Sequence, residues 1–91
     1  MFTINHRKPS IRGNEEEISI RGEKLNNKLS IHKRSSGYFA TASGHNDDLI
    51  KFLDTLPYLS NKTLKSDKYY WWELDHQKVI QLMNDVMRNF E

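Results

Sequence analysis

The sequence contains no cysteine among its 91 residues. A disulfide framework, a thiolate nucleophile and a zinc site with thiolate ligands are therefore excluded. Small secreted domains usually depend on disulfides, so we expect an intracellular, cytoplasmic protein. The sequence also has no apolar run approaching the roughly 18 residues of a membrane span, and residues 1–8 are too polar to resemble a signal peptide. We expect a protein without a membrane partner.

Glycine and proline are also scarce, with four and two residues. The glycines stand singly, so there is no glycine-rich loop to cradle a phosphate. None of the four histidines has a spacing typical of metal ligands. His45 lies beside Asp47 and Asp48, which would suit a divalent cation and a small metal-dependent nuclease, but the start of a helix explains the same residues. We expect no enzyme, no metal and no cofactor.

Alternating apolar and polar residues predict strands in the first half of the chain. Residues 1–16 are predicted to form an N-terminal arm with a short edge strand at 2–4. Ile18 and Ile20 alternate with polar residues, which predicts a strand that extends to about residue 24. The same pattern predicts two more strands, near 28–31 and at 38–42, with a loop at 6–14 and turns at 26–27 and 35–37. Three strands joined by short turns form an antiparallel meander.

Two later segments have the spacing of amphipathic helices. Asn46 is expected to cap the first helix, and Pro57 to end it. Asp75 is expected to cap the second helix. The apolar stripes are Leu49, Phe52, Leu53 and Leu56 in the first helix, and Val79, Leu82, Met83, Val86 and Phe90 in the second. The polar segment between the helices, 60–68, is predicted to be a loop or a hairpin arm.

The bulkiest segment is Tyr69-Tyr70-Trp71-Trp72, and its aromatic residues are typical of a strand. Its period of two places Tyr70 and Trp72 on one face with Leu74, where we expect the core. Tyr69 and Trp71 lie on the other face, where they either pack or contact a partner. The whole pattern predicts a single α+β domain over 1–91. In it, the meander and the aromatic strand form a small antiparallel sheet, and two helices pack on one face.

Charge is unevenly distributed, because residues 1–45 hold eight basic against four acidic residues and residues 46–91 hold six against eight. Five cations gather on the predicted hairpin over 21–34, namely Arg21, Lys24, Lys28, Lys33 and Arg34. A ribbon rich in Lys and Arg can lie along phosphates, with contacts that are mostly independent of sequence. The same residues also suit a solvated hairpin whose lysines prevent aggregation at a sheet edge.

From Tyr38 to about Met87, the order of features resembles the HARP-type accessory module of annealing helicases. That module has an apolar strand, a short helix ending near Leu-Pro, a polar connector, an aromatic strand with a tryptophan, and a final helix. The corresponding segments here are Phe39 to Ala42, Asp48 to Pro57, Trp71 to Leu74, and Val79 to Val86. The connector differs, because no basic–aromatic step follows the Leu-Pro. The resemblance implies binding to structured or branched DNA, and it carries over no particular functional residue.

Two functions are consistent with these residues. The first is a non-catalytic binding module that engages nucleic acid through the basic hairpin. The alternative is a small phage-type inhibitor or adaptor that binds a host nucleic-acid-processing protein. A chain of this size, rich in Asn, Lys and Ile and lacking a catalytic set, is similar in style to phage proteins that block CRISPR or restriction nucleases. Its aromatic strand or its acidic half would then contact the partner.

Overall fold

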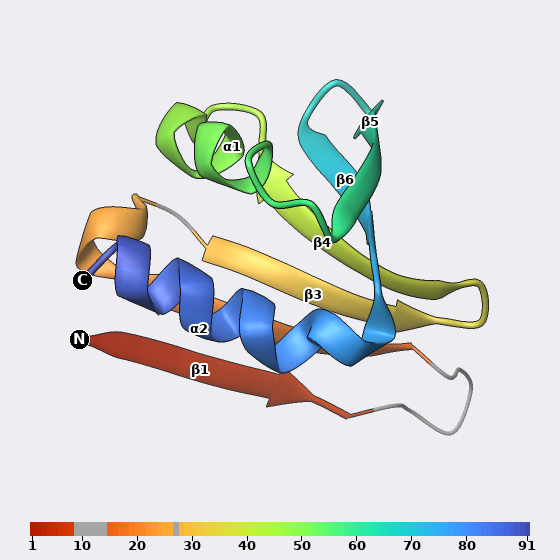
Figure 1. The fold of residues 1–91 in the computed structure, drawn as a ribbon, viewed down its shortest axis with the longest axis horizontal. Helices are drawn as coiled ribbons and strands as arrows, with labels where there is room; N and C mark the ends of the chain where they lie inside the picture. The colour runs from red at the N-terminus through yellow and green to blue at the C-terminus, as the bar shows by residue number, and fades with distance from the viewer. Residues whose placement is uncertain (9–14, 27) are drawn as a thin grey trace.

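The structure is a computed structural model, and it describes residues 1–8, 15–26 and 28–91. Within these ranges, one antiparallel sheet has six strands in the order β1-β2-β3-β4-β6-β5 (Figure 1). The strands are β1 (Phe2–Arg7), β2 (Glu16–Gly22), β3 (Lys28–Arg34), β4 (Gly37–Ser43), β5 (Leu59–Lys65) and β6 (Tyr69–Leu74). The helices are α1 (Asp47–Leu53) and α2 (Val79–Asn89), and the 3-10 turns are η1 (Glu23–Leu25) and η2 (His76–Lys78).

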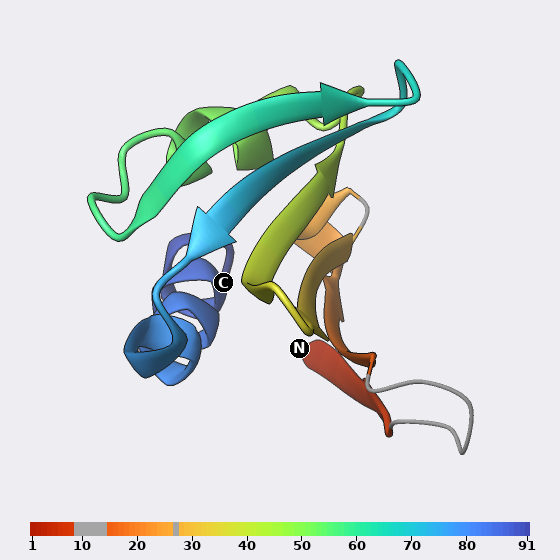
Figure 2. The same ribbon diagram turned by 90° about the vertical axis from the view of Figure 1, so that its right-hand side faces the viewer.

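Both helices lie on the same side of the sheet (Figure 1, Figure 2). We call this side the helix-covered face and the other side the open face. Successive side chains of a strand alternate between the two faces, so the sequence pattern decides which residues meet the helices. The α+β fold, with a small antiparallel sheet and two helices, is confirmed.

The core lies between the helix-covered face and the two helices. It includes residues with no exposed surface from both layers, such as Ile20 and Leu29 of the sheet, Leu49 of α1 and Leu82 of α2. Phe52 of α1 contacts Phe90 edge-on, with the ring centroids 5.8 Å apart, and this contact joins the ends of the two helices. A small domain depends on such bulky contacts, because it buries a smaller share of its surface than a large one.

The aromatic strand β6 completes this core as its period of two predicts. Trp72 and Leu74 are buried on the helix-covered face, and Tyr70 packs against the same cluster. Trp72 lies opposite Ala40 in the pairing of β4 with β6. The small alanine leaves space for the indole, as expected where large and small residues meet across a packed sheet.

The segment 60–68, predicted as a loop or a hairpin arm, contains most of strand β5, which forms one edge of the sheet. Lys65 to Lys68 form a turn between β5 and β6, closed by a hydrogen bond of 3.1 Å from the Lys68 N–H to the Lys65 carbonyl, and the central residues Ser66 and Asp67 have φ of 56° and 55°. Positive φ at both central residues is typical of the two-residue turns whose twist matches that of the strands. Near Asn61, with φ of 52°, the pairing shifts register between Ser60 and Thr63. Such a bulge twists an edge strand and hinders pairing with another chain.

The N-terminal arm forms the opposite edge of the sheet. Strand β1 extends to Arg7, which is longer than the predicted 2–4, and the loop predicted over 6–14 therefore starts later. Residues 9–14 of that loop lie outside the described residues. Gly22 at the end of β2 lies directly under the Phe2 ring, because a Cβ on it would be 2.6 Å from Phe2 Cδ1. This close approach helps to hold the start of β1 on the sheet.

Three local predictions have different outcomes. Asp75 caps the C-terminal helical segment as predicted, since its Oδ1 accepts a hydrogen bond of 3.0 Å from the Gln77 backbone, although η2 precedes α2. The prediction that the Asn46 side chain caps α1 is wrong. Its Nδ2 instead donates to the Leu25 carbonyl at 2.6 Å, which ties α1 to η1. At the predicted Asn-Asn turn, Asn26 has φ of 59°, and Asn27 lies outside the described residues.

Neither of the described helices has the length and apolar character that crossing a bilayer requires.

Candidate functional site

Trp71 lies on the open face of β6, next to the edge strand β5, and contacts side chains from three other strands. Its ring stacks on His32 of β3, with centroids 4.9 Å apart and planes at 23°. Phe39 of β4 contacts it edge-on at 5.8 Å. Cζ of Arg34 lies 4.4 Å from the ring centroid, and Nζ of Lys65 lies 4.6 Å from it. We call these five residues the Trp71 cluster.

The sheet order explains how this cluster forms. Strand β4 lies between β3 and β6, and Thr41 is the residue opposite Trp71. Because Thr41 is small, the indole can extend over β4 to reach His32 on β3. Cations near an indole face are attracted by its quadrupole, by about 0.5–1 kcal/mol at exposed sites. The Trp71 cluster therefore combines aromatic surface with two permanent positive charges.

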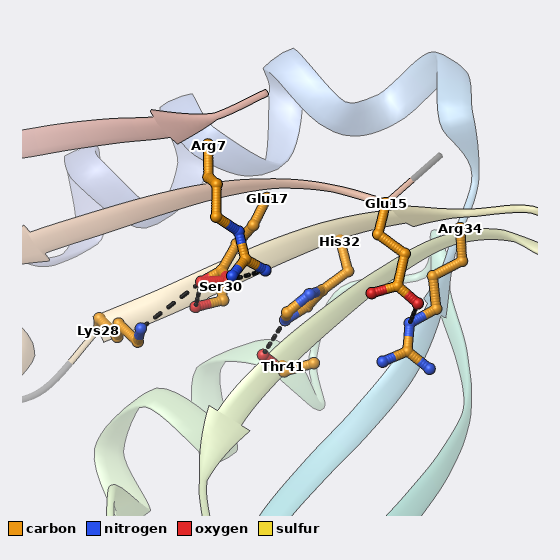
Figure 3. A network of polar contacts seen from close by, with 8 residues as sticks. All are labelled: Arg7, Glu15, Glu17, Lys28, Ser30, His32, Arg34 and Thr41. Atoms are coloured by element: carbon orange, nitrogen blue, oxygen red, sulfur yellow. Dashed lines mark hydrogen bonds and ion pairs between the residues drawn. The ribbon is translucent and has the colours of Figure 1, made fainter. Parts of the chain in front are cut away.

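Glu17 of β2 is the centre of a polar network beside this cluster (Figure 3). Its carboxylate lies 3.3 Å from Arg7 Nη2 and 3.5 Å from Lys28 Nζ, and it accepts a hydrogen bond of 3.3 Å from the Ser30 hydroxyl. Burial alone would raise the pKa of Glu17, but His32, Lys28, Arg7 and the Ser30 hydroxyl together lower it below its ordinary value. Glu17 is thus an anion that organises the cations of β1 and β3.

Glu15 makes a looser contact with Arg34. Its Oε1 lies 3.8 Å from Arg34 Nε, which is too far for a hydrogen bond. Within the described ranges, Arg34 Nε is buried and has no hydrogen-bond partner. The Trp71 ring, whose centroid lies 4.4 Å from Cζ, is the second contact of this guanidinium.

His32 is the titratable member of the cluster. Its Nε2 lies 3.3 Å from the Thr41 hydroxyl, and its ring is partly buried against Trp71. Burial lowers the pKa of His32, Glu17 opposes this shift, and Arg34 and Arg7 add to it. The folded protein therefore favours the neutral imidazole.

We expect the protein to lose stability as the pH falls through the range in which His32 titrates. The folded-state pKa of His32 is lowered, so below about pH 6.5 the unfolded chain binds more protons than the folded one. The free energy of unfolding therefore rises with pH across the interval between the two pKa values and levels off above it. Urea titrations between pH 5 and 8 measure this slope.

The variant His32→Phe keeps a ring on Trp71 and removes the titrating group. We expect its free energy of unfolding to depend less on pH than that of the wild type over the same range. Parallel profiles for the two proteins would contradict a partly buried, neutral His32.

The five cations of the predicted basic hairpin do not share one face. Lys28 and Arg34 lie on the open face, where Arg21 is the residue opposite Lys28. Lys33 belongs to the helix-covered side of β3, like Leu29 and Ile31, and is exposed beyond the core. Lys24 is exposed in η1. The structure therefore brings Arg21 and Lys28 together, adds Arg34 farther along the same face, and separates Lys24 and Lys33 from them.

The two predicted interface aromatics both lie on the open face. Tyr69 is 49% exposed, whereas Trp71 is half-buried within its cluster. Two hollows adjoin Trp71. One, of about 190 Å³, lies towards β3 and also borders Tyr69, and the other, of about 120 Å³, lies towards β5 and also borders Phe39 and Lys65.

His32, Phe39 and Lys65 are members of the site that the sequence did not identify. The alternation of side chains along β3 was a usable signal, because it places His32 and Arg34 on the face opposite to Ile31 and Lys33. The signal was insufficient, because nothing local indicates that β6 pairs with β4. The alternative group His45, Asp47 and Asp48 is exposed at the start of α1, and no cluster of three or more metal-binding side chains occurs in the described part of the chain.

Comparison of this chain with models of protein families, with curated proteins and with solved structures finds no match. The resemblance to the HARP-type module stays a prediction from the order of sequence features.

Proposed function

We propose that this protein is a non-catalytic module that binds nucleic acid on the open face of its sheet. The observation that carries the proposal is that Tyr69 and Trp71 share this face with Arg21, Lys28, Arg34 and Lys65. Cations neutralise phosphates, and aromatic rings stack on bases whatever their identity. A sheet face that carries both can hold a backbone and its bases at once.

Carboxylates on the same face do not prevent this binding. The contacts of Glu17 with Lys28 and of Glu15 with Arg34 are long, at 3.5 and 3.8 Å, and their cations are each more than a third exposed. Ion pairs of this kind contribute about 0–1 kcal/mol. A phosphate group, which carries a full charge and several acceptor oxygens, can therefore compete for Lys28 and Arg34.

The first test of the proposal is the salt dependence of binding, measured by fluorescence anisotropy with labelled single-stranded and double-stranded oligonucleotides. Suppose that three or four of the cations contact phosphates of a single strand. A plot of the logarithm of the association constant against the logarithm of the salt concentration should then have a slope of about −2 to −3. Absence of binding at low salt, or binding that salt does not weaken, would contradict the proposal.

A second candidate function is a small inhibitor or adaptor that binds a host nucleic-acid-processing protein. The observation in its favour is that Trp71 is half-buried among His32, Arg34 and Lys65. Tryptophans held in packed surroundings are common anchor residues of protein interfaces. A pull-down from nuclease-treated host lysate separates the two functions. A stoichiometric protein that Trp71→Ala no longer captures favours the inhibitor, and recovery of nucleic acid alone favours the binding module.

A further inference from the structure

We infer that the hollow between Tyr69 and Trp71 binds one unpaired nucleobase, so that the module selects single-stranded nucleic acid. This inference rests on the proposed function, and it names the form of nucleic acid that the open face recognises. It draws on the spacing of the two aromatics, the size and lining of the hollow, and the charge at its rim.

The spacing of the two aromatic residues suits an inserted flat ring. Tyr69 and Trp71 are alternate residues of β6, so their side chains leave the same face about 6.7 Å apart along the strand. Stacked bases lie about 3.4 Å apart. Two stacking distances add up to about the same length, so the two positions are far enough apart along β6 for one flat ring to lie between them.

The hollow beside these rings has the size and lining for a base. Its volume is about 190 Å³, and Tyr69, Trp71 and His32 contribute its aromatic walls. Ser30 and Thr41, which are 4% and 6% exposed, form the polar floor of the same hollow. The Ser30 hydroxyl donates to Glu17 and the Thr41 hydroxyl is hydrogen-bonded to His32, and each oxygen keeps acceptor capacity for an N–H group at the edge of a base.

Charge at the rim places the backbone beside the base. Lys28 borders the hollow on the β3 side, and Arg21 lies opposite Lys28 on β2. A phosphate held by these cations would put its attached sugar at the mouth of the hollow. Glu17 also borders the hollow, and its ionised carboxylate would repel a phosphate that entered the interior. The charges thus favour a base inside the hollow and a phosphate outside.

This arrangement excludes a base within a duplex. Bases of a duplex are stacked on their neighbours, and their faces are not accessible to protein side chains unless the base leaves the stack. In a single strand, the bases can be splayed out and stacked on aromatic side chains. Insertion between Tyr69 and Trp71 therefore requires an unpaired base.

The test compares three fluorescein-labelled oligonucleotides of equal length: a single strand, the corresponding duplex, and a strand of abasic sugars that keeps every phosphate. We expect the single strand to bind more tightly than the abasic strand by about fivefold to a hundredfold, the range for stacking of one base. The duplex should also bind more weakly than the single strand. Tyr69→Ala should remove the difference between single and abasic strands, and Tyr69→Phe should keep it.

A matched control is Ile80→Ala, because Ile80 is a large apolar residue that is 67% exposed on α2. It should leave all three affinities unchanged. Circular dichroism and urea unfolding of each variant establish that it is folded. Equal affinities for the single strand and the abasic strand would overturn the base site but leave phosphate binding intact. Failure of all three oligonucleotides to bind would overturn the proposed function together with the base site.

Discussion

Replacing Trp72 by alanine should lower the free energy of unfolding by about 3–5 kcal/mol, the usual cost of deleting a large buried aromatic. Trp72 is 2% exposed, and its Nε1 donates to Asp54 Oδ1 at 3.3 Å. The substitution leaves a cavity opposite Ala40 and removes this hydrogen bond to Asp54, the residue that follows α1. Because small domains have about 5–15 kcal/mol of stability in total, a large part would be lost. Urea unfolding measures the change.

The neighbouring Trp71 provides the matched comparison. Its ring is half-buried on the open face, so Trp71→Ala should cost only about 1–2 kcal/mol through lost stacking and cation contacts. Trp71→Ala should nevertheless weaken binding to single strands by about fivefold to a hundredfold, whereas Trp72→Phe, which keeps an aromatic ring in the core, should retain it. Equal destabilisation by the two alanine variants would contradict the assignment of the two tryptophans to opposite faces.

This difference between adjacent tryptophans could be predicted from the sequence because it depends on a local rule. Alternate residues of a strand face opposite sides, so the strand assignment alone separates Trp72 from Trp71. The helical stripes were predicted for the same reason, since the spacing of Leu49 and Leu53, or of Leu82 and Val86, depends only on helix geometry.

Features that depend on contacts between distant segments could not be predicted. Strand β5 has almost no apolar residues, because it is an exposed edge, and its polar sequence resembles a loop. The pairing of β6 with β4 places Lys65, Phe39 and His32 around Trp71, and no local pattern indicates that pairing. The Asn46 side chain had a plausible local partner at its own helix, but the Leu25 carbonyl, 21 residues away, accepts its hydrogen bond instead.

In the basic hairpin, cations that are close in sequence lie on different faces of the sheet. Lys28, Lys33 and Arg34 are close in sequence, and proximity alone suggested one phosphate-binding group. The period of two separates Lys33 from the other two, just as it separates Trp72 from Trp71. A charge cluster on a strand therefore has to be divided by face before its partner is considered.

The combined variant Lys28→Glu and Arg34→Glu should weaken binding to single-stranded nucleic acid by about a hundredfold or more. Two hydrogen bonds to charged phosphates are each expected to contribute about 1.5–3 kcal/mol, which corresponds to this loss. The slope of the salt dependence should also decrease, by about 0.7 for each phosphate contact removed. Anisotropy titrations at several salt concentrations measure both quantities.

The control is Lys33→Glu, which makes one such replacement on the same strand but on the helix-covered side, and it is compared with the double variant and with Lys28→Glu alone. It should lower affinity only slightly, through the general decrease in positive charge. New glutamates near Glu17 and Glu15 can also strain the fold, so Lys28→Gln with Arg34→Gln provides a neutral variant that should still lose binding. If Lys33→Glu weakened binding as much as the double variant, net charge rather than the open face would determine affinity, and the proposed surface would be wrong. If only the open-face variants lose binding, the face of the strand on which a cation lies determines its contribution.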